Sequence, residues 1–200
     1  MNPVNEVIKE LEFHPLVPER WKDLEILFGK TGACGGCWCM WWRLKRSQFE
    51  KQKGLQNKKA LKKIVDSGEI PGILAYTNGQ PIAWCSVAKR RMYPVLERSR
   101  ILKRIDDEPV WSVVCFFVTK SFRHKKVTVK LLQTVIEYVS ERGGKIIEGY
   151  PVEPKKNQIS DVFAWTGLAS AFRKAGFVEV VRRSPTRPIM RYTIDENISR

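Results

Sequence analysis

Residues 110–152, VWSVVCFFVTKSFRHKKVTVKLLQTVIEYVSERGGKIIEGYPV, decide the fold. The stretch begins with a run that is apolar at nearly every position, which is typical of a strand covered on both faces. A helical pattern follows over residues 126–142, and Gly143 and Gly144 end it. A second apolar strand starts near Lys145. The order strand, helix, strand predicts a βαβ unit whose two strands run parallel.

Segments on either side supply further elements. Residues 11–17 predict a first strand, and residues 18–28 predict a helix that Gly29 ends. Residues 57–68 predict a short amphipathic helix capped by Asn57. Two β-rich runs flank Asn78-Gly79, a strong hairpin signal. A late helix over residues 162–176 and closing strands at 177–183 and 188–194 complete an α/β chain with a mixed sheet.

Length and composition predict one globular domain over residues 1–200, since 43% of the residues are hydrophobic and 28% are charged. No apolar run approaches the roughly 20 residues of a membrane helix. The N-terminal residues lack the apolar region of a secretory signal. We therefore expect a soluble, cytoplasmic protein.

The net charge of +15 predicts an anionic partner. That partner is either the phosphate of a small cofactor or a nucleic acid. Residues 43–63 hold nine basic residues and one acid, Glu50, and the alternative for this block is a solvated basic surface.

The turn between the apolar strand and its helix is a candidate phosphate site. The first turn of a helix offers unpaired N–H groups and partial positive charge. Basic side chains at that place are locally unfavourable, and Arg123, His124, Lys125 and Lys126 follow one another here. The cluster therefore favours a bound anion, the alternative being a turn that meets only water.

Residues 113–154 resemble the acetyl-CoA-binding half of the GNAT family of N-acetyltransferases. That family shows a strand ending in valine, an aromatic residue, and an Arg/Gln-x-x-Gly-x-Gly/Ala turn that opens a helix. Val118, Phe122 and Arg123 match, whereas Lys126 and Thr128 stand at the two glycine positions. Residues 172–180, FRKAGFVEV, resemble the family's late helix-to-strand junction, and the element order fits from residue 11 to residue 194.

The resemblance implies a mostly antiparallel sheet, flanked by helices, with one parallel βαβ unit. It implies acetyl transfer from acetyl-CoA to an amine of a small molecule or a protein, by direct attack. The pantetheine arm is expected in a gap between the strand ending at Val118 and the strand starting near Lys145, where the Val118 N–H would polarise the thioester carbonyl. The cofactor-binding residues it implies are Phe116, Phe117, Val118, Arg123, His124, Lys125, Lys126, Val127, Thr128 and Thr166.

The catalytic acid and base are predicted separately. Many family members place a tyrosine acid at the position of Phe172, and phenylalanine has no proton to donate. Tyr150 is the substitute acid, and Glu148, on the same sheet face, is a candidate base. Glu108, before the central strand, is the other candidate base. The alternatives are a buried aromatic residue and solvated carboxylates.

CGGCWCMWW, residues 34–42, lies where the family builds its acceptor site, so we expect Cys37, Trp38 and Trp41 to contact the acceptor. The Cys-x-x-Cys spacing would suit zinc, but no second cysteine pair or nearby histidine completes a site, so free thiols with packed tryptophans are expected and no metal. Two other functions stay open. One is a catalytically weak relative that binds CoA, and the other is a basic nucleic-acid-associated protein.

Overall fold

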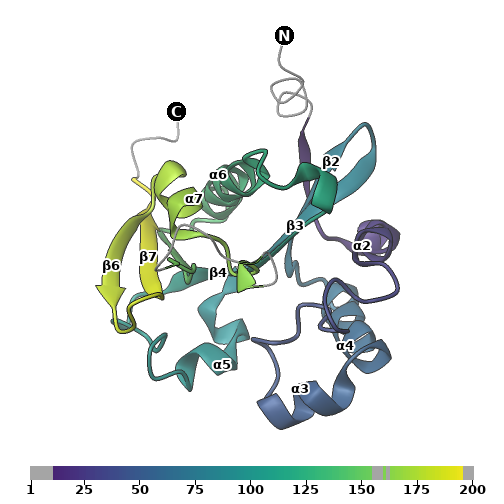
Figure 1. Cartoon of the computed structure of the whole chain (residues 1–200), viewed down its shortest axis with the longest axis horizontal. Coiled ribbons are helices and arrows are strands. Elements are labelled where there is room, and N and C mark those ends of the chain that lie inside the picture. The colour runs from purple at the N-terminus through teal and green to yellow at the C-terminus, as the bar shows by residue number, and fades with distance from the viewer. Residues whose placement is uncertain (1–10, 155–159, 161–162, 196–200) are drawn as a thin grey trace.

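The computed structural model describes residues 11–154, 160 and 163–195. Its strands form one sheet in the order β1-β2-β3-β4-β5-β7-β6 (Figure 1). All neighbours pair antiparallel except β4 and β5, which are parallel, so the predicted mixed, mostly antiparallel sheet is confirmed. The strands are β1 (Glu12–Pro15), β2 (Gly72–Thr77), β3 (Gln80–Lys89), β4 (Val110–Val118), β5 (Ile146–Gly149), β6 (Val178–Arg182) and β7 (Pro188–Thr193).

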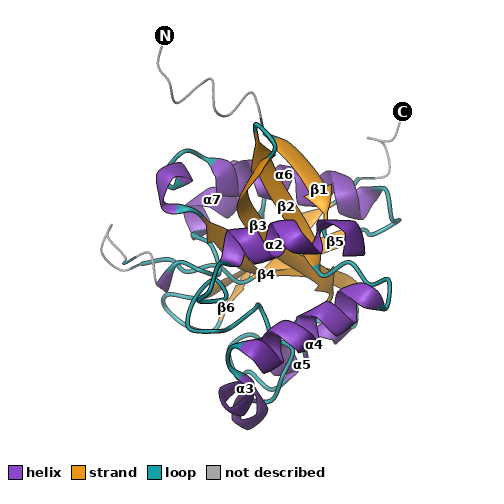
Figure 2. Cartoon of the chain, turned by 90° about the vertical axis from the view of Figure 1, so that its right-hand side faces the viewer, coloured by secondary structure: helices purple, strands orange, loops and turns teal. Residues whose placement is uncertain are grey.

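Helices cover both faces of the sheet. Helices α6 and α7 lie on one side, and α2, α3 and α4 lie on the other (Figures 1 and 2). Each face has its own buried apolar cluster. Within the described residues, no helix is both long and apolar enough to cross a bilayer. The helices are α2 (Trp21–Phe28), α3 (Arg46–Gln52), α4 (Leu55–Asp66), α5 (Pro94–Glu97), α6 (Val127–Ser140) and α7 (Ala169–Lys174).

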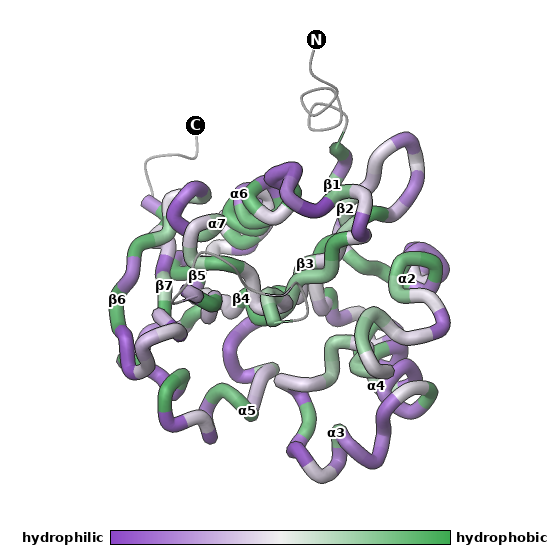
Figure 3. The backbone as a smooth tube through the Cα atoms, viewed as in Figure 1, coloured by the Kyte–Doolittle hydropathy of each residue, from purple (hydrophilic) through white to green (hydrophobic). Residues whose placement is uncertain are grey.

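Helix α6 packs by the apolar stripe that its sequence shows. Leu131, Leu132, Val135 and Val139 have no exposed surface. Burying each such side chain stabilises the fold by about 1.5–3 kcal/mol. Figure 3 shows α6 as mainly hydrophobic and α3 as mainly hydrophilic. Because α6 connects β4 to β5 and these two strands pair parallel, the predicted βαβ unit is confirmed.

The predicted hairpin is also confirmed. β2 and β3 pair antiparallel on either side of Asn78 and Gly79. Both turn residues have positive φ, 48° and 70°, as a tight two-residue hairpin turn requires.

Two helix predictions need correction. Helix α4 begins at Leu55 after Gly54, so Asn57 lies inside the helix and does not cap it. Asn57 is fully buried, and its Nδ2 donates to the Gly36 carbonyl, 3.2 Å away. Its polar group therefore holds a loop from elsewhere in the chain, and no local pattern announces such a contact.

The late helix is much shorter than predicted. Leu168 is extended and forms a parallel bridge with Val152, so α7 begins only at Ala169. Gly167 has φ +84°, and a Cβ there would lie 2.8 Å from the Phe172 ring. Thr166 therefore lies in a turn before α7, not on the helix.

Candidate active site

Strands β4 and β5 separate partway along their length. Their pairing ends at Val113 and Gly149, while β4 continues to Val118 beside β3 alone. The Phe116 N–H points away from β3 and into this gap. Because N–H directions alternate along a strand, the Val118 N–H faces the gap as well.

The gap next to Phe116 is filled by the protein itself. The Phe116 N–H donates to the Trp165 carbonyl, 2.6 Å away. The chain from Trp165 to Leu168 runs on to the Val152–Leu168 bridge. The two strands do part, as predicted, but of the two N–H groups only that of Phe116 is engaged by this segment.

The side chains at the end of β4 point to opposite faces. Phe116 packs edge-on against Phe172, with ring centroids 6.0 Å apart, on the α6 side. Val118 packs on the same side. Phe117 packs on Phe28, 5.7 Å away, in the cluster on the other side. The structure thus brings Phe116 and Val118 to the face of α6 and places Phe117 on the opposite face.

The turn before α6 has the backbone that glycines usually provide. His124 and Lys126 both have φ of 61°, in the left-handed region. Lys126 is the N-cap of α6, and no side chain caps the helix. The N–H groups of Val127 and Thr128, at the first turn, therefore face outward as donors. This uncapped terminus fits a phosphate group despite the missing glycines.

The basic side chains of the turn have different environments. Arg123 is half-buried, and its Nε donates to the Val118 carbonyl at 3.1 Å, which holds it at the end of β4. Lys125 Nζ lies 5.4 Å from the centre of the Phe122 ring. His124 and Lys126 are exposed. Val118, Arg123 and the first turn of α6 are thus close together at one end of the sheet.

Glu148 lies in a buried ionic network. It is 1% exposed, and its Oε1 accepts hydrogen bonds from Arg90 Nη1 and from the Tyr150 hydroxyl, each at 2.7 Å. Its Oε2 accepts from Arg191 Nε at 2.8 Å. Both carboxylate oxygens are therefore engaged, and in this conformation Glu148 does not reach an external amine directly.

Tyr150 belongs to the same network and has no exposed surface. Its hydroxyl lies 2.9 Å from Ser112 Oγ. Burial, and then the nearby Glu148 carboxylate, raise the pKa of Tyr150 well above its usual value. Glu108 lies elsewhere: it is exposed and precedes β4, about 33 Å along an extended chain from Val118. The structure brings Glu148 and Tyr150 together and separates Glu108 from the β4 end.

A pocket of about 340 Å³ opens on the other side of the sheet from α6. Trp41 and Trp42 contact Trp165, with ring centroids 6.2 and 5.7 Å apart. The Trp42 indole donates to the Val114 carbonyl at 3.1 Å. The lining residues are Trp41, Trp42, Val95, Arg98, Ser99, Ile101, Leu102, Trp165 and Arg187.

The carbonyl that Trp42 covers belongs to an irregularity in β4. Val113 pairs with Val87 and Cys115 pairs with Ser86, so Val114 is an extra residue on β4. Such a bulge bends the strand and re-aims its backbone groups. Trp42, which lines the pocket, therefore contacts the centre of β4, close to the place where β4 and β5 part.

Of the predicted acceptor residues, only Trp41 lines this pocket. Trp38 is 5% exposed and stacks on Trp21, with centroids 6.1 Å apart. Cys37 Sγ donates to the Gly32 carbonyl at 3.6 Å, and burial raises the pKa of the Cys37 thiol to about 11. Cys37 and Trp38 therefore belong to the packed loop behind the pocket.

The thiols of Cys39, Cys85 and Cys115 are buried in the core, whereas that of Cys34 is exposed. Cys39 Sγ lies 3.5 Å from Cys115 Sγ and accepts a hydrogen bond from the Trp84 indole. Across the described ranges, no group of three His, Cys, Asp or Glu side chains is placed to hold a metal ion.

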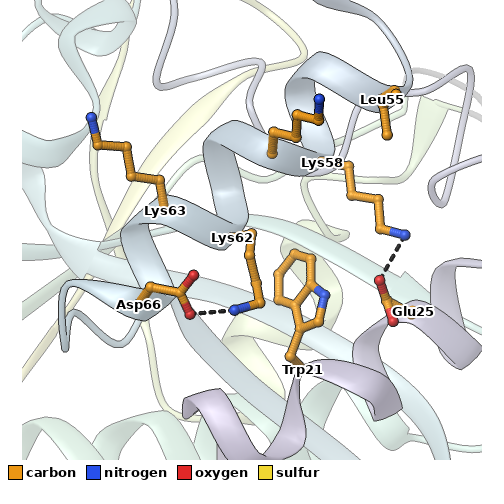
Figure 4. Close-up of a pocket in the computed structure, with 8 residues that line it drawn as sticks. Trp21, Glu25, Leu55, Lys58, Lys62, Lys63 and Asp66 are labelled. Atoms are coloured by element: carbon orange, nitrogen blue, oxygen red, sulfur yellow. Dashed lines mark hydrogen bonds and ion pairs between the residues drawn. The ribbon is translucent and has the colours of Figure 1, made fainter.

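A second pocket, of about 380 Å³, lies between α2 and α4, and half of the residues that line it are lysines (Figure 4). Lys58 Nζ is 2.6 Å from Glu25 Oε1, and Lys62 pairs with Asp66. Two of its lysines thus have acidic partners. Such ion pairs are what the alternative of a solvated basic surface predicts for this part of residues 43–63.

Sequence reasoning missed Trp165, Arg98 and Arg187. Thr166 is fully buried, and its hydroxyl accepts from Arg187 Nη1 at 2.7 Å, so it holds an arginine of this pocket. The three missed residues come from three separate loops, and no local pattern singles them out. The tryptophan pair at 41–42 was the one available signal.

The separating β4–β5 pair, followed by the uncapped N-terminus of α6, is compatible with the class of acyl-group transferases that use a phosphorylated carrier. Residues 38–161 match the family model described as acetyltransferase (GNAT) family. The chain therefore belongs to the GNAT acetyltransferase family, and the resemblance read from its sequence is confirmed.

Solved structures show the same fold at low identity. The PaiA N-acetyltransferase from Thermoplasma acidophilum, in complex with coenzyme A, has 16% identity and a TM-score of 0.52, over 92% of this chain and 99% of that chain. YncA from Salmonella typhimurium, with its cofactor acetyl-CoA, has 10% identity and a TM-score of 0.53, over 95% and 97%. A GNAT acetyltransferase from Listeria monocytogenes has 9% identity and a TM-score of 0.57, over 92% and 95%. No curated protein sequence matches the chain significantly.

Proposed function

We propose that this protein transfers an acetyl group from acetyl-CoA to an amine. The observation that carries the proposal is the geometry at the end of β4. The N–H groups of Phe116 and Val118 face a gap that leads directly to the uncapped first turn of α6. One site thus offers the Val118 N–H as a backbone donor for an extended arm and a positive helix terminus for phosphates.

Three groups of this chain would hold the cofactor. The N–H groups of Val127 and Thr128 would donate to the pyrophosphate, as the left-handed backbone at Lys126 allows. Arg123 would add a cation at the same end of the sheet, and Lys126 would add an exposed one. Two of the solved structures with this fold hold coenzyme A or acetyl-CoA, which supports the choice of cofactor.

Acetyl-CoA supplies the acetyl group as a thioester. The amine nitrogen attacks the carbonyl carbon, a C–N bond forms, the C–S bond breaks, and the proton lost by nitrogen ends on the CoA sulfur. The Phe116 N–H is engaged by Trp165, so Val118 provides the available backbone donor for the carbonyl oxygen.

The catalytic acid and base stay predictions. Glu148 and Tyr150 are fully hydrogen-bonded within the core, so either would exchange a proton with the acceptor only through a relay. The cytoplasmic location also stays a prediction.

Calorimetric titration with acetyl-CoA at moderate salt tests the proposal, together with detection of free CoA thiol in the presence of amines. Arg123→Ala should weaken binding by about five- to tenfold, or roughly 1 kcal/mol, because a cation near the phosphates is lost. Lys63→Ala, on α4 across the sheet, is the matched control and should bind normally.

Absence of binding at millimolar acetyl-CoA would refute the proposal, and equal affinities of the two variants would refute the placement of the phosphates. Binding without thiol release from any amine would identify a CoA-binding relative that has lost transfer.

A further inference from the structure

The charged side chains that line the pocket of Trp41, Trp42 and Trp165 are all positive. Arg98 and Arg187 line it, and none of the described residues that line it is acidic. Several other arginines pair with carboxylates, as Arg90 does with Glu97 and Glu148. An apolar pocket with two such cations is built to take an anionic group.

Arg187 is the better placed of the two cations. It is half-buried, its Nη1 donates to the Thr166 hydroxyl at 2.7 Å, and the Tyr150 carbonyl lies 3.5 Å from the same nitrogen. Within the described chain no carboxylate lies within ion-pair distance of it, and burial lowers the pKa of Arg187 from its usual value. The uncharged partners fix the guanidinium, and among the described residues none accepts a hydrogen bond from its Nε or Nη2.

The contacts of Trp41 and Trp42 argue against a cationic ligand in the pocket. The guanidinium carbon of Arg46 lies 4.7 Å from the centre of the Trp41 ring, so one face of that indole already holds a cation. Trp42 uses its N–H on the Val114 carbonyl. The indoles therefore offer flat apolar surface, which suits a hydrocarbon or aromatic skeleton.

We propose that this pocket binds the acceptor, and that the acceptor is a small amine that carries a carboxylate on an apolar or aromatic skeleton, as an aromatic amino acid does. This inference rests on the proposed acetyl transfer for the role of the amine. A guanidinium matches a carboxylate through paired N–H donors. The volume of about 340 Å³ is at the lower end of small-molecule sites, which favours a single small molecule over a protein chain.

The test compares two ligands that differ by one carboxylate. Binding of N-acetylphenylalanine and of N-acetylphenethylamine, which mimic the two possible products, is measured by tryptophan fluorescence and calorimetry. The carboxylate ligand should bind at least about tenfold more tightly, because it gains charge-assisted hydrogen bonds. Arg187→Gln should remove that preference.

Arg98→Gln keeps the test decisive if the Arg187 variant fails to fold, since Arg98 is exposed. Arg98→Gln should weaken binding of the carboxylate ligand about threefold and leave binding of the neutral ligand unchanged. Arg100→Gln removes the same charge two residues away, outside the pocket lining, and should change neither.

Three outcomes would overturn the acceptor assignment. The two ligands bind equally tightly, neither binds at millimolar concentration, or Arg98→Gln and Arg100→Gln have equal effects on binding. Acetyl transfer to phenethylamine at the rate seen with phenylalanine would overturn it too, and would leave the transferase proposal standing. A carboxylate preference that depends on Arg98, in a protein that does not bind acetyl-CoA, would uphold the pocket and refute the transferase.

Discussion

Replacing Lys126 by glycine should stabilise the protein. Lys126 has φ 61° and ψ 12°, and a residue with a Cβ loses about 1–2 kcal/mol in this left-handed conformation. Removing a cation from the N-terminus of α6 adds a few tenths of a kcal/mol. Glycine increases the entropy of the unfolded chain, which costs about 0.4–1 kcal/mol. The net gain is therefore about 1 kcal/mol, or roughly 2–4 °C in melting temperature for a chain of this size.

Thermal and denaturant unfolding of two further variants separate the causes. Lys126→Ala removes the charge but keeps the Cβ, so its unfolding free energy should change by less than about 0.5 kcal/mol. Lys125 has no positive φ, so Lys125→Gly should lose about 0.5–1 kcal/mol. If Lys126→Gly is no more stable than Lys126→Ala, the strain argument fails.

Lys126→Gly should bind acetyl-CoA more weakly than the unchanged protein, although it is more stable. The Lys126 side chain is exposed, so it adds charge near the phosphates without filling the turn. Its loss should weaken binding by about two- to fivefold, and raised salt should shrink the difference. Tighter binding of Lys126→Gly would show instead that the side chain obstructs the cofactor.

Two further predictions concern buried groups. Glu148→Gln should lower the unfolding free energy by about 3 kcal/mol in denaturant titrations, because Arg90 and Arg191 lose a buried anionic partner; an unchanged midpoint would contradict this. Iodoacetamide at pH 8 should modify exposed Cys34 and spare Cys37, whose raised pKa of about 11 keeps the thiol protonated. Mass spectrometry that finds both cysteines modified equally at pH 8 would contradict the burial of Cys37. Since the pKa of Cys37 exceeds the ordinary value of 9.0, the contribution of its thiol to the unfolding free energy is complete below about pH 9 and is lost as pH rises through 11.

Predictions from local patterns succeeded where neighbours in sequence are neighbours in space. The hairpin at Asn78-Gly79 and the stripe of α6 depend on turn chemistry and on a repeat of 3.6 residues. The helix predicted at 162–176 failed because a tertiary contact overrides local preference. Leu168 pairs with Val152, and the chain at Gly167 packs against the Phe116 and Phe172 rings.

The candidate site likewise has one part that local sequence predicted and one part that depends on tertiary contacts. The turn proposed to bind phosphate was visible in the sequence because its parts are consecutive, and the structure adds that Lys126 has a glycine-like backbone. The pocket proposed for the acceptor could not be predicted as a whole from the sequence. Trp41 was predicted, but Cys37 and Trp38 pack behind the pocket, and Arg187 reaches it from the loop between β6 and β7.

The sequence by itself therefore determined the order of elements, the parallel βαβ unit and the family resemblance, since each depends on periodicity or on spacing within a continuous stretch. Only the tertiary structure decided what lies in the gap beside β4 and which charged side chains line the pocket of Trp41, Trp42 and Trp165. Trp165, Arg98 and Arg187 meet because the sheet order places β7 beside β5 and brings three loops to one face. That juxtaposition arises from the burial of both sheet faces, to which distant parts of the chain contribute together.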